Sequence, residues 1–430
     1  MSVLIKGGRV IDPASRTDQV MDVLVEGDRI VRIAPGIGQQ ANRVIDARGW
    51  WVVPGVIDMH THLRQPGQEH KETIATGTRA AAAGGVTAVA CMPNTQPPID
   101  DASVVEHVQA VARREGVVGV RVIGALTKGR QGKELAEMGE MAEAGAVAFS
   151  DDGDTVADAS LMRSALQYAA DLGRPVIVHA LDPCLARGGV MREGPVSLRL
   201  GLPGIPAEAE SIVVARDIAL AAATGAHLHV AHVSTARSVE LIRQAKQAGV
   251  RVTAEVTPHH LFLTEEALEG YDASAKVSPP LGTEEDRQAL RQALADGIID
   301  AVASDHAPHA PEEKEVELDQ APFGAVGLET LVALTLGALT HQGVLTPMQA
   351  VRALSLAPAR ILGLEGGVLA EGARADITLF DPAQEWTVEP ARFRSRGRNS
   401  PFAGWKVQGR PVGTVVGGRI AMLAGTIDDG

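Results

Sequence analysis

Short apolar stretches alternate with amphipathic, alanine-rich stretches through most of the 430-residue chain, and this alternation constrains the fold more than any other feature. Eight apolar stretches have the length of buried strands: 52–60, 87–91, 119–123, 146–149, 175–179, 227–233, 250–256 and 300–304. In one intervening stretch, Ser234 or Thr235 can cap the start of a helix and Gly249 follows its end. Eight strand–helix units predict an α/β fold, a (β/α)8 barrel of the TIM type, with functional residues at the carboxyl ends of the strands.

The two chain ends have a different texture from the middle. Residues 1–52 and the segment beyond 360 contain short β-like runs separated by Gly, Asp and Pro, without a helical period. We therefore expect two domains. Residues 53–359 form the barrel, and residues 1–52 together with 360–430 form one small discontinuous β-sandwich domain beside it.

Composition narrows the class of partner. A net charge of -13 argues against a general nucleic-acid or anionic-membrane surface, because both attract basic patches. No run approaches the roughly 20 apolar residues that a membrane span needs, and the first residues do not resemble a secretory signal. The chain has two cysteines, which fits a reducing compartment. We expect a cytoplasmic protein that binds neither nucleic acid nor membrane.

Ligand-type side chains stand at the predicted strand ends. Positions 58, 60 and 62 alternate onto one face, so His60 and His62 point the same way. With the later strand ends, the set is His60, His62, Asp152, His179, His232 and Asp305. Six nitrogen and oxygen donors exceed what one tetrahedral zinc ion takes, so two metal ions that share a carboxylate are the natural interpretation. Asp151 is the alternative to Asp152 as a ligand.

Such a site is typical of a hydrolase. Two adjacent cations lower the pKa of a shared water and polarise a carbonyl group, while a nearby carboxylate moves a proton to the departing nitrogen. Asp305 is the candidate for that proton transfer. His229 alternates to the other face from His232 and is expected to be packed or hydrogen-bonded. The sequence leaves His259 and His260 undecided.

Several motifs resemble those of the amidohydrolase superfamily and, within it, the class I bacterial dihydroorotases. They occupy residues 54–64, 84–87, 92–95, 150–153, 229–235, 305–309 and 321–324. The resemblance implies reversible hydrolysis of the cyclic amide of (S)-dihydroorotate to N-carbamoyl-L-aspartate in de novo pyrimidine biosynthesis, by a metal-activated hydroxide. Zinc is the usual ion in this family.

The resemblance also assigns roles to the metal ligands. His60 and His62 would bind one zinc ion, and His179 and His232 would bind the other. Asp152 would bridge the two ions, and Asp305 would touch the first and act as general base and acid. Many relatives use a carboxylated lysine as the bridge, but residues 146–154 contain no lysine, which favours an aspartate bridge.

The resemblance places a second group of residues around the substrate. Arg64, Asn94 and His309 would hold the substrate carboxylate, as a guanidinium can bind a carboxylate through two hydrogen bonds. The other substrate contacts would come from His62, Ser278, Phe323 and Gly324. Ser278 departs from the family, since many relatives have an asparagine there. Residues 312–315, within the 308–322 loop, are expected to be solvated and mobile, and the loop is a candidate lid.

Two alternatives stay open. Another cyclic amidohydrolase, such as a hydantoinase, dihydropyrimidinase or allantoinase, would keep the metals, but its uncharged substrate would not need Arg64. A non-catalytic assembly partner of aspartate transcarbamoylase is the second alternative, although such chains usually lack metal ligands. An active enzyme that also binds aspartate transcarbamoylase is compatible with the sequence. A homodimer is the expected oligomeric state.

Overall fold

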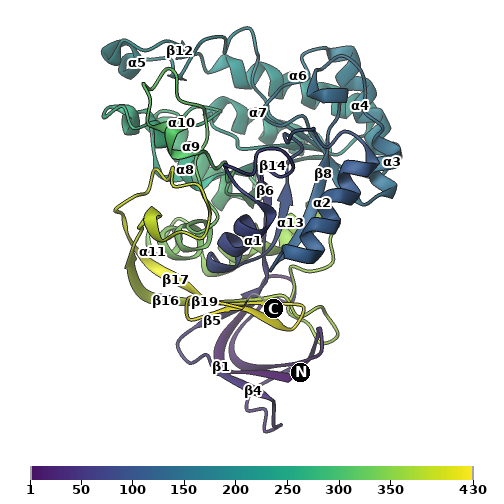
Figure 1. Ribbon diagram of the computed structural model, residues 1–430, viewed down its shortest axis with the longest axis vertical. Coiled ribbons are helices and arrows are strands. Elements are labelled where there is room, and N and C mark those ends of the chain that lie inside the picture. Colours follow the sequence, from purple (N-terminus) through teal and green to yellow (C-terminus); the bar gives the residue numbers. More distant parts are fainter. Residues whose placement is uncertain (1, 429–430) are drawn as a thin grey trace.

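The computed structural model describes residues 2–428, which form two large β-sheets stacked end to end with helices around the upper one (Figure 1). The upper sheet has eight parallel strands in the order β15-β14-β13-β10-β9-β8-β7-β6. Their bounds are β6 Val56–Thr61, β7 Val86–Cys91, β8 Gly119–Gly124, β9 Ala146–Phe149, β10 Val176–Val178, β13 Leu228–Val230, β14 Val252–Val256 and β15 Ala301–Val302. Each of the eight strands overlaps one of the eight predicted stretches, which confirms the barrel.

The sheet closes where its first and last strands meet. A bridge pairs Thr61 with His306, four residues after β15, and the His62 N–H donates to the His306 carbonyl at 2.8 Å. This contact brings the carboxyl ends of β6 and β15 together. The residues that follow these two strands therefore share one side of the barrel mouth.

Helices cover the outside of the barrel (Figure 1). The longer ones are α1 Ile74–Ala83, α2 Ala102–Glu115, α4 Ala159–Asp171, α6 Glu208–Thr224, α7 Ala236–Gln247 and α9 Glu284–Ala295. The shorter ones are α3 Met138–Glu143, α5 Pro195–Leu200, α8 Pro258–Phe262, α10 Pro311–Lys314, α11 Leu339–His341, α12 Pro347–Val351 and α13 Ala357–Leu362. Thr235 caps α7 by accepting from the Ser238 N–H, as the sequence predicts. Within residues 2–428, no helix is long and apolar enough to cross a membrane.

Short elements fill several connections. A two-stranded sheet of β11 Met191–Arg192 and β12 Gly204–Ile205 lies between β10 and α6. Single turns of 3-10 helix occur at Lys128–Arg130, Glu265–Leu268, Ala273–Ala275 and Pro390–Arg392. Two π-helical stretches, Ala333–Ala338 and Arg352–Leu356, continue directly into α11 and α13.

Both chain ends contribute to the lower, nine-stranded sheet. Its strands are β1 Ser2–Asp12, β2 Thr17–Glu26, β3 Arg29–Ala34, β4 Arg43–Asp46, β5 Trp51–Pro54, β16 Ile377–Thr387, β17 Lys406–Val416, β18 Arg419–Leu423 and β19 Thr426–Ile427. The order is β19-β18-β17-β16-β5-β1-β2-β3, with β4 beside β1. β5 joins the halves, because it pairs with β1 on one side and with β16 on the other.

The predicted single strand at 52–60 is wrong in one respect, because the chain changes sheets in the middle of it. β5 ends at Pro54 in the lower sheet, and β6 begins at Val56 in the barrel. Gly55, between them, donates its N–H to the Asp376 carbonyl at 2.8 Å. A Cβ at Gly55 would lie 2.3 Å from Thr87 Oγ1, so a side chain does not fit at this crossing.

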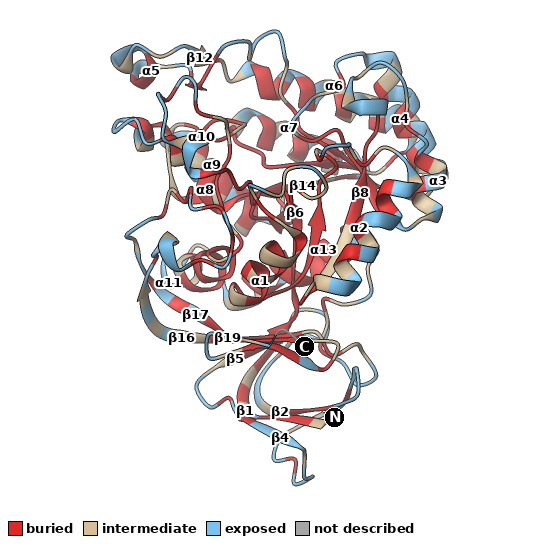
Figure 2. Ribbon diagram, viewed as in Figure 1, coloured by how far each residue is buried: buried red, intermediate tan, exposed pale blue. Residues whose placement is uncertain are grey.

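Buried residues occur in the strands of both sheets and on parts of the surrounding helices (Figure 2). The largest cluster packs the outer faces of the barrel strands against the helices, and another fills the lower sheet. A small cluster that includes Met59, Ala90 and Ile123 fills the barrel interior. This interior layer supports the polar residues at the carboxyl ends of the strands, which lie beyond it.

Candidate metal centre

The six predicted ligands converge at the carboxyl end of the barrel. His60 lies in β6 and His62 just after it, while Asp152, His179, His232 and Asp305 follow β9, β10, β13 and β15. Every one of the six is at most 6% exposed. Buried imidazoles and carboxylates need partners, so their convergence from five strands forms a group of donors that could hold a cation.

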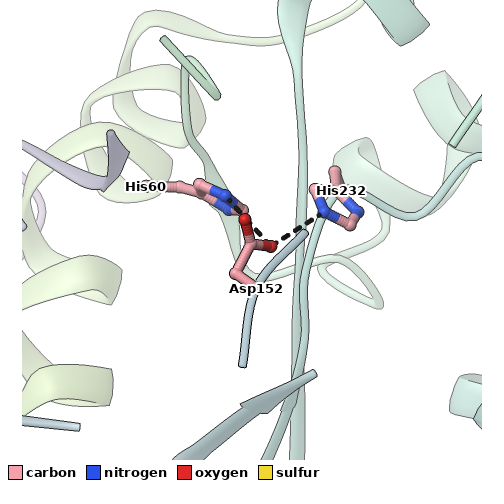
Figure 3. Close-up of side chains that lie close together, drawn as sticks. All are labelled: His60, Asp152 and His232. Atoms are coloured by element: carbon pink, nitrogen blue, oxygen red, sulfur yellow. Dashed lines mark hydrogen bonds and ion pairs between the residues drawn. The ribbon is translucent and has the colours of Figure 1, made fainter. Parts of the chain in front are cut away.

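Asp152 lies at the centre of the cluster (Figure 3). Its Oδ1 lies 3.4 Å from His60 Nε2, 3.4 Å from His232 Nε2 and 3.8 Å from His179 Nδ1. Its Oδ2 lies 3.4 Å from His62 Nε2. One carboxylate therefore faces all four imidazoles, which is the arrangement expected of a group shared between two ions.

Asp151 is excluded as the central carboxylate. Its side chain points away from the cluster and accepts hydrogen bonds from the Leu126 N–H at 2.9 Å, from the Thr127 N–H at 3.1 Å and from the Thr127 hydroxyl. Asp151 thus fixes the turn that presents Asp152. Of the two adjacent aspartates, Asp152 is the one placed to bind a metal.

The donors fit divalent cations in two overlapping groups. The ligand atoms of His60, Asp152 and His232 all lie within 4.8 Å of one another, and so do those of His60, His62 and Asp305. The Nε2 atom of His60 is buried, belongs to both groups and has no hydrogen-bond partner. Imidazole nitrogen with carboxylate oxygen is a donor set that zinc and similar ions accept.

Electrostatics in the cluster also favour a cation. Burial by itself lowers the pKa of His60, but the carboxylates of Asp152, Glu255 and Asp305 raise it well above its usual value. Burial dominates at His179 and lowers its pKa to about 4, so this imidazole is neutral at physiological pH, the state in which it can bind a metal. The cluster therefore concentrates negative charge that bound divalent ions would neutralise.

Three site residues have strained backbones. Arg64, His232 and Asp305 have φ angles of 61°, 33° and 47°, in the left-handed region that non-glycine residues rarely adopt. Each lies two or three residues after a barrel strand, where the chain turns out of the sheet. Such strain is found where a fold holds a side chain in one functional direction.

Glu255 and Asp58 are residues of the site that the sequence analysis missed. Glu255 Oε1 lies 2.6 Å from His60 Nδ1, and Oε2 lies 3.3 Å from His229 Nε2. Asp58 accepts from the N–H groups of His60 and Ser304 at 3.3 Å and 3.0 Å. Both carboxylates are fully buried, and each lies within a barrel strand rather than after its end. A carboxylate on the far nitrogen of a ligand histidine orients the ring.

Arg64 and Asn94 lie beside the metal cluster. Arg64 is 8% exposed, and its Nε donates to the Pro308 carbonyl at 3.2 Å. Burial lowers the pKa of this guanidinium to about 10, so it keeps its charge at neutral pH. Asn94 Oδ1 lies 2.7 Å from His62 Nδ1, which directs His62 Nε2 toward the carboxylates. Asn94 therefore orients a metal-site histidine, a role the sequence did not predict.

The other predicted substrate residues lie on the loop wall of the mouth. His309 Nε2 lies 2.9 Å from the Phe323 carbonyl. The Gly324 N–H already donates to the Lys276 carbonyl at 2.8 Å, so it is not free for a ligand in this conformation. Ser278 is partly buried and precedes Pro279, whose carbonyl contacts His260 Nε2 at 3.0 Å.

The expectation that residues 312–315 are simply solvated and mobile is wrong for two of them. Glu313 forms an ion pair with Lys71 at 2.8 Å. Lys314 Nζ donates to the carbonyls of Ala273 and Pro322 at 2.9 Å and 2.7 Å. These contacts hold the loop against the barrel mouth. Sequence alone could not show them, because their partners are distant in the chain.

Fold and site together define a metal-dependent hydrolase of the amidohydrolase type, and comparison with known proteins agrees. The model of the amidohydrolase family matches residues 51–421, so the chain belongs to that family. Its relatives include a dihydroorotase of Pelotomaculum thermopropionicum, 57% identical over 98% of this chain and 99% of the relative. A dihydroorotase of Syntrophus aciditrophicus is 50% identical over the same shares.

Solved structures show the same architecture. An L-hydantoinase from Arthrobacter aurescens superposes with a TM-score of 0.89 over 99% of this chain and 97% of its own, at 27% identity. A dihydropyrimidinase from Brevibacillus agri superposes with a TM-score of 0.86 over 99% and 96%, at 28% identity. Identity is thus far higher to the dihydroorotases than to these hydantoinase-type proteins.

Proposed function

We propose that this chain is a dihydroorotase, which reversibly hydrolyses the cyclic amide of (S)-dihydroorotate to N-carbamoyl-L-aspartate in de novo pyrimidine biosynthesis. The observation that carries the proposal is the buried guanidinium of Arg64 beside a six-donor metal cluster. A buried cation at a metal centre needs an anionic partner, and the carboxylate of dihydroorotate supplies one. Full-length relatives at 50–57% identity carry the name dihydroorotase.

We propose that the cluster holds two zinc ions. His60, His62 and Asp305 would bind one ion, His179 and His232 the other, and Asp152 would bridge them. Two observations support a shared centre: His60 belongs to both donor groups, and the Asp152 carboxylate faces all four imidazoles. Bound divalent ions would lower the pKa of a water molecule and polarise the amide carbonyl of the substrate.

The remaining chemistry belongs to the side chains around the substrate. Asp305, 3.2 Å from His62 Nε2, would take a proton from the attacking water and pass it to the departing ring nitrogen. Arg64, with Asn94 and His309, would hold the substrate carboxylate and so fix the amide carbon at the metal centre. Burial of Asp305, Arg64 and His309 limits the access of bulk water and strengthens their interactions.

A cyclic amidohydrolase of another specificity is the second candidate, since the solved structures of the same fold include hydantoinases and a dihydropyrimidinase. Arg64 argues against it, because those ring amides carry no carboxylate for a guanidinium to bind. Membership of class I, a homodimer, a complex with aspartate transcarbamoylase and a cytoplasmic location stay predictions from the resemblance.

The test measures the zinc content of the purified protein and its hydrolysis of dihydroorotate, hydantoin, dihydrouracil and allantoin in parallel. We expect dihydroorotate to be the preferred substrate and chelation to abolish turnover. Arg64→Lys should raise the KM for dihydroorotate about tenfold or more, because a point charge cannot reproduce two parallel hydrogen bonds. Preference for an uncharged ring, or an unchanged KM in the variant, would refute the assignment.

A further inference from the structure

A second cavity lies at the end of the barrel opposite the metal centre, where α2 and β8 stand above the lower sheet (Figure 1). Its volume is about 580 Å³. α2, the amino-terminal half of β8, β17 and β18 contribute to its walls. The charged side chains that line it are Arg113, Arg121, Arg374 and Arg419, and within residues 2–428 no aspartate or glutamate belongs to the lining.

The partly buried guanidinium of Arg121 is the main evidence for a ligand in this cavity. It lies in β8 two residues before Ile123, which packs inside the barrel, so Arg121 points into the lower end of the same interior. Its Nε is buried and has no hydrogen-bond partner among the described residues. Within residues 2–428, no ion pair to its guanidinium is formed either. A partly buried cation without a counter-charge is destabilising, so it points to an anionic ligand.

The other three arginines keep N–H groups available for the same cavity. Arg374 uses its Nε for Asp376 at 3.0 Å, and Arg419 donates to the main-chain carbonyls of Val117 and Asp428 at 2.9 Å and 3.2 Å. Arg113, in the last turn of α2, is exposed. Among the described residues, the lining of the cavity contributes four cations and no carboxylate, which favours a local positive field in a chain whose net charge is -13.

We propose that this cavity binds a small organic phosphate of about the size of a nucleotide. Guanidinium groups match phosphate oxygens with paired N–H donors, and several arginines around one group are typical of phosphate sites. Val118, Val120 and Leu364 offer apolar contacts for the organic part. The volume lies in the range of ligand sites, about 300–1,000 Å³. The site is separate from the catalytic mouth and independent of the function proposed above.

The test is calorimetric titration of the metal-loaded protein with ADP, pyrophosphate, adenosine and succinate. We expect pyrophosphate and ADP to bind, ADP more tightly, and adenosine and succinate to bind weakly or not at all. Arg121→Gln should weaken ADP roughly tenfold or more, the effect of losing a charge-assisted hydrogen bond. Arg114→Gln is the matched control, because Arg114 lies on the same helix but pairs with Glu115 outside the cavity.

Arg121→Gln should leave turnover of dihydroorotate unchanged, and ADP should not compete with that substrate. Arg113→Gln, at an exposed position, provides a second variant that should also weaken ADP if replacement of Arg121 disturbs folding. The proposal is overturned if ADP does not bind at millimolar concentration or if succinate binds equally well. It is also overturned if ADP competes with dihydroorotate, or if both cavity variants bind ADP like the wild type.

Discussion

Replacing Glu255 by glutamine tests whether the buried carboxylate behind His60 controls metal binding. The side chain keeps its size and one oxygen near His60 Nδ1, but it loses the charge that now lies 2.6 Å from that nitrogen. A hydrogen bond to a charged group contributes about 1.5–3 kcal/mol and a neutral one about 0.5–1.5 kcal/mol. Weakening the hydrogen bond to His60 therefore costs about 1–1.5 kcal/mol of zinc-binding free energy, or roughly tenfold in zinc affinity.

The second contact of Glu255, with His229 Nε2 at 3.3 Å, adds to this loss. We therefore expect zinc binding to weaken by roughly 10- to 100-fold, the range seen for partners of ligand histidines. The assay is competition for zinc against a chelator of known affinity at pH 8. Thr253→Val is the matched control, because it removes only a hydroxyl 2.9 Å from His229 Nδ1 and should change zinc affinity far less.

The loss of zinc affinity in Glu255→Gln should also depend on pH. In the metal-free wild type, Glu255 helps to raise the pKa of His60, so His60 holds a proton that zinc must displace. Glu255→Gln lacks this charge, so the proton on its His60 is easier to displace. The difference between wild type and variant should therefore shrink as the pH falls from 8 to 6. Zinc affinity within about twofold of wild type at pH 8, in a folded variant, would refute the reasoning.

Two further predictions address proton transfer and stability. Asp305→Asn should lower kcat by at least about 100-fold while zinc content stays close to that of the wild type, and near-normal kcat would contradict its role as general base. Burial raises the pKa of Asp217 from 3.8 to about 6 despite its contact with Arg216, so wild-type stability should fall as pH rises through that window. Asp217→Asn lacks this titration. Measured by denaturant unfolding, its free energy of unfolding should rise by about 3 kcal/mol relative to that of the wild type between pH 3.5 and 6.5. A difference between the two proteins that does not change with pH would exclude the effect.

The candidate metal ligands could be predicted from sequence because each one lies at or just after the carboxyl end of a barrel strand. Parallel strands of a closed barrel end at the same mouth, so His179 and His232 must come close once the strands are identified. Glu255 could not be found in this way. It lies within β14 and reaches His60 across the barrel, 195 residues away in the chain, and nothing local distinguishes it from any buried carboxylate. The same holds for Arg121, whose lack of a partner is visible only in three dimensions.

The lower sheet also has a place in the site that its sequence does not suggest. Between β16 and β17 the chain leaves that sheet and places Asn399 against the barrel mouth, where Nδ2 donates to the carbonyls of Ala307 and Gly324. Asn399 Oδ1 accepts from the His309 N–H at 3.2 Å. One amide thus connects both ends of the 308–322 loop. Because β16 pairs with β5 and β17 pairs with β16, the connection that carries Asn399 is anchored at both ends in the lower sheet, and the small β unit thereby supports the loop wall of the barrel mouth.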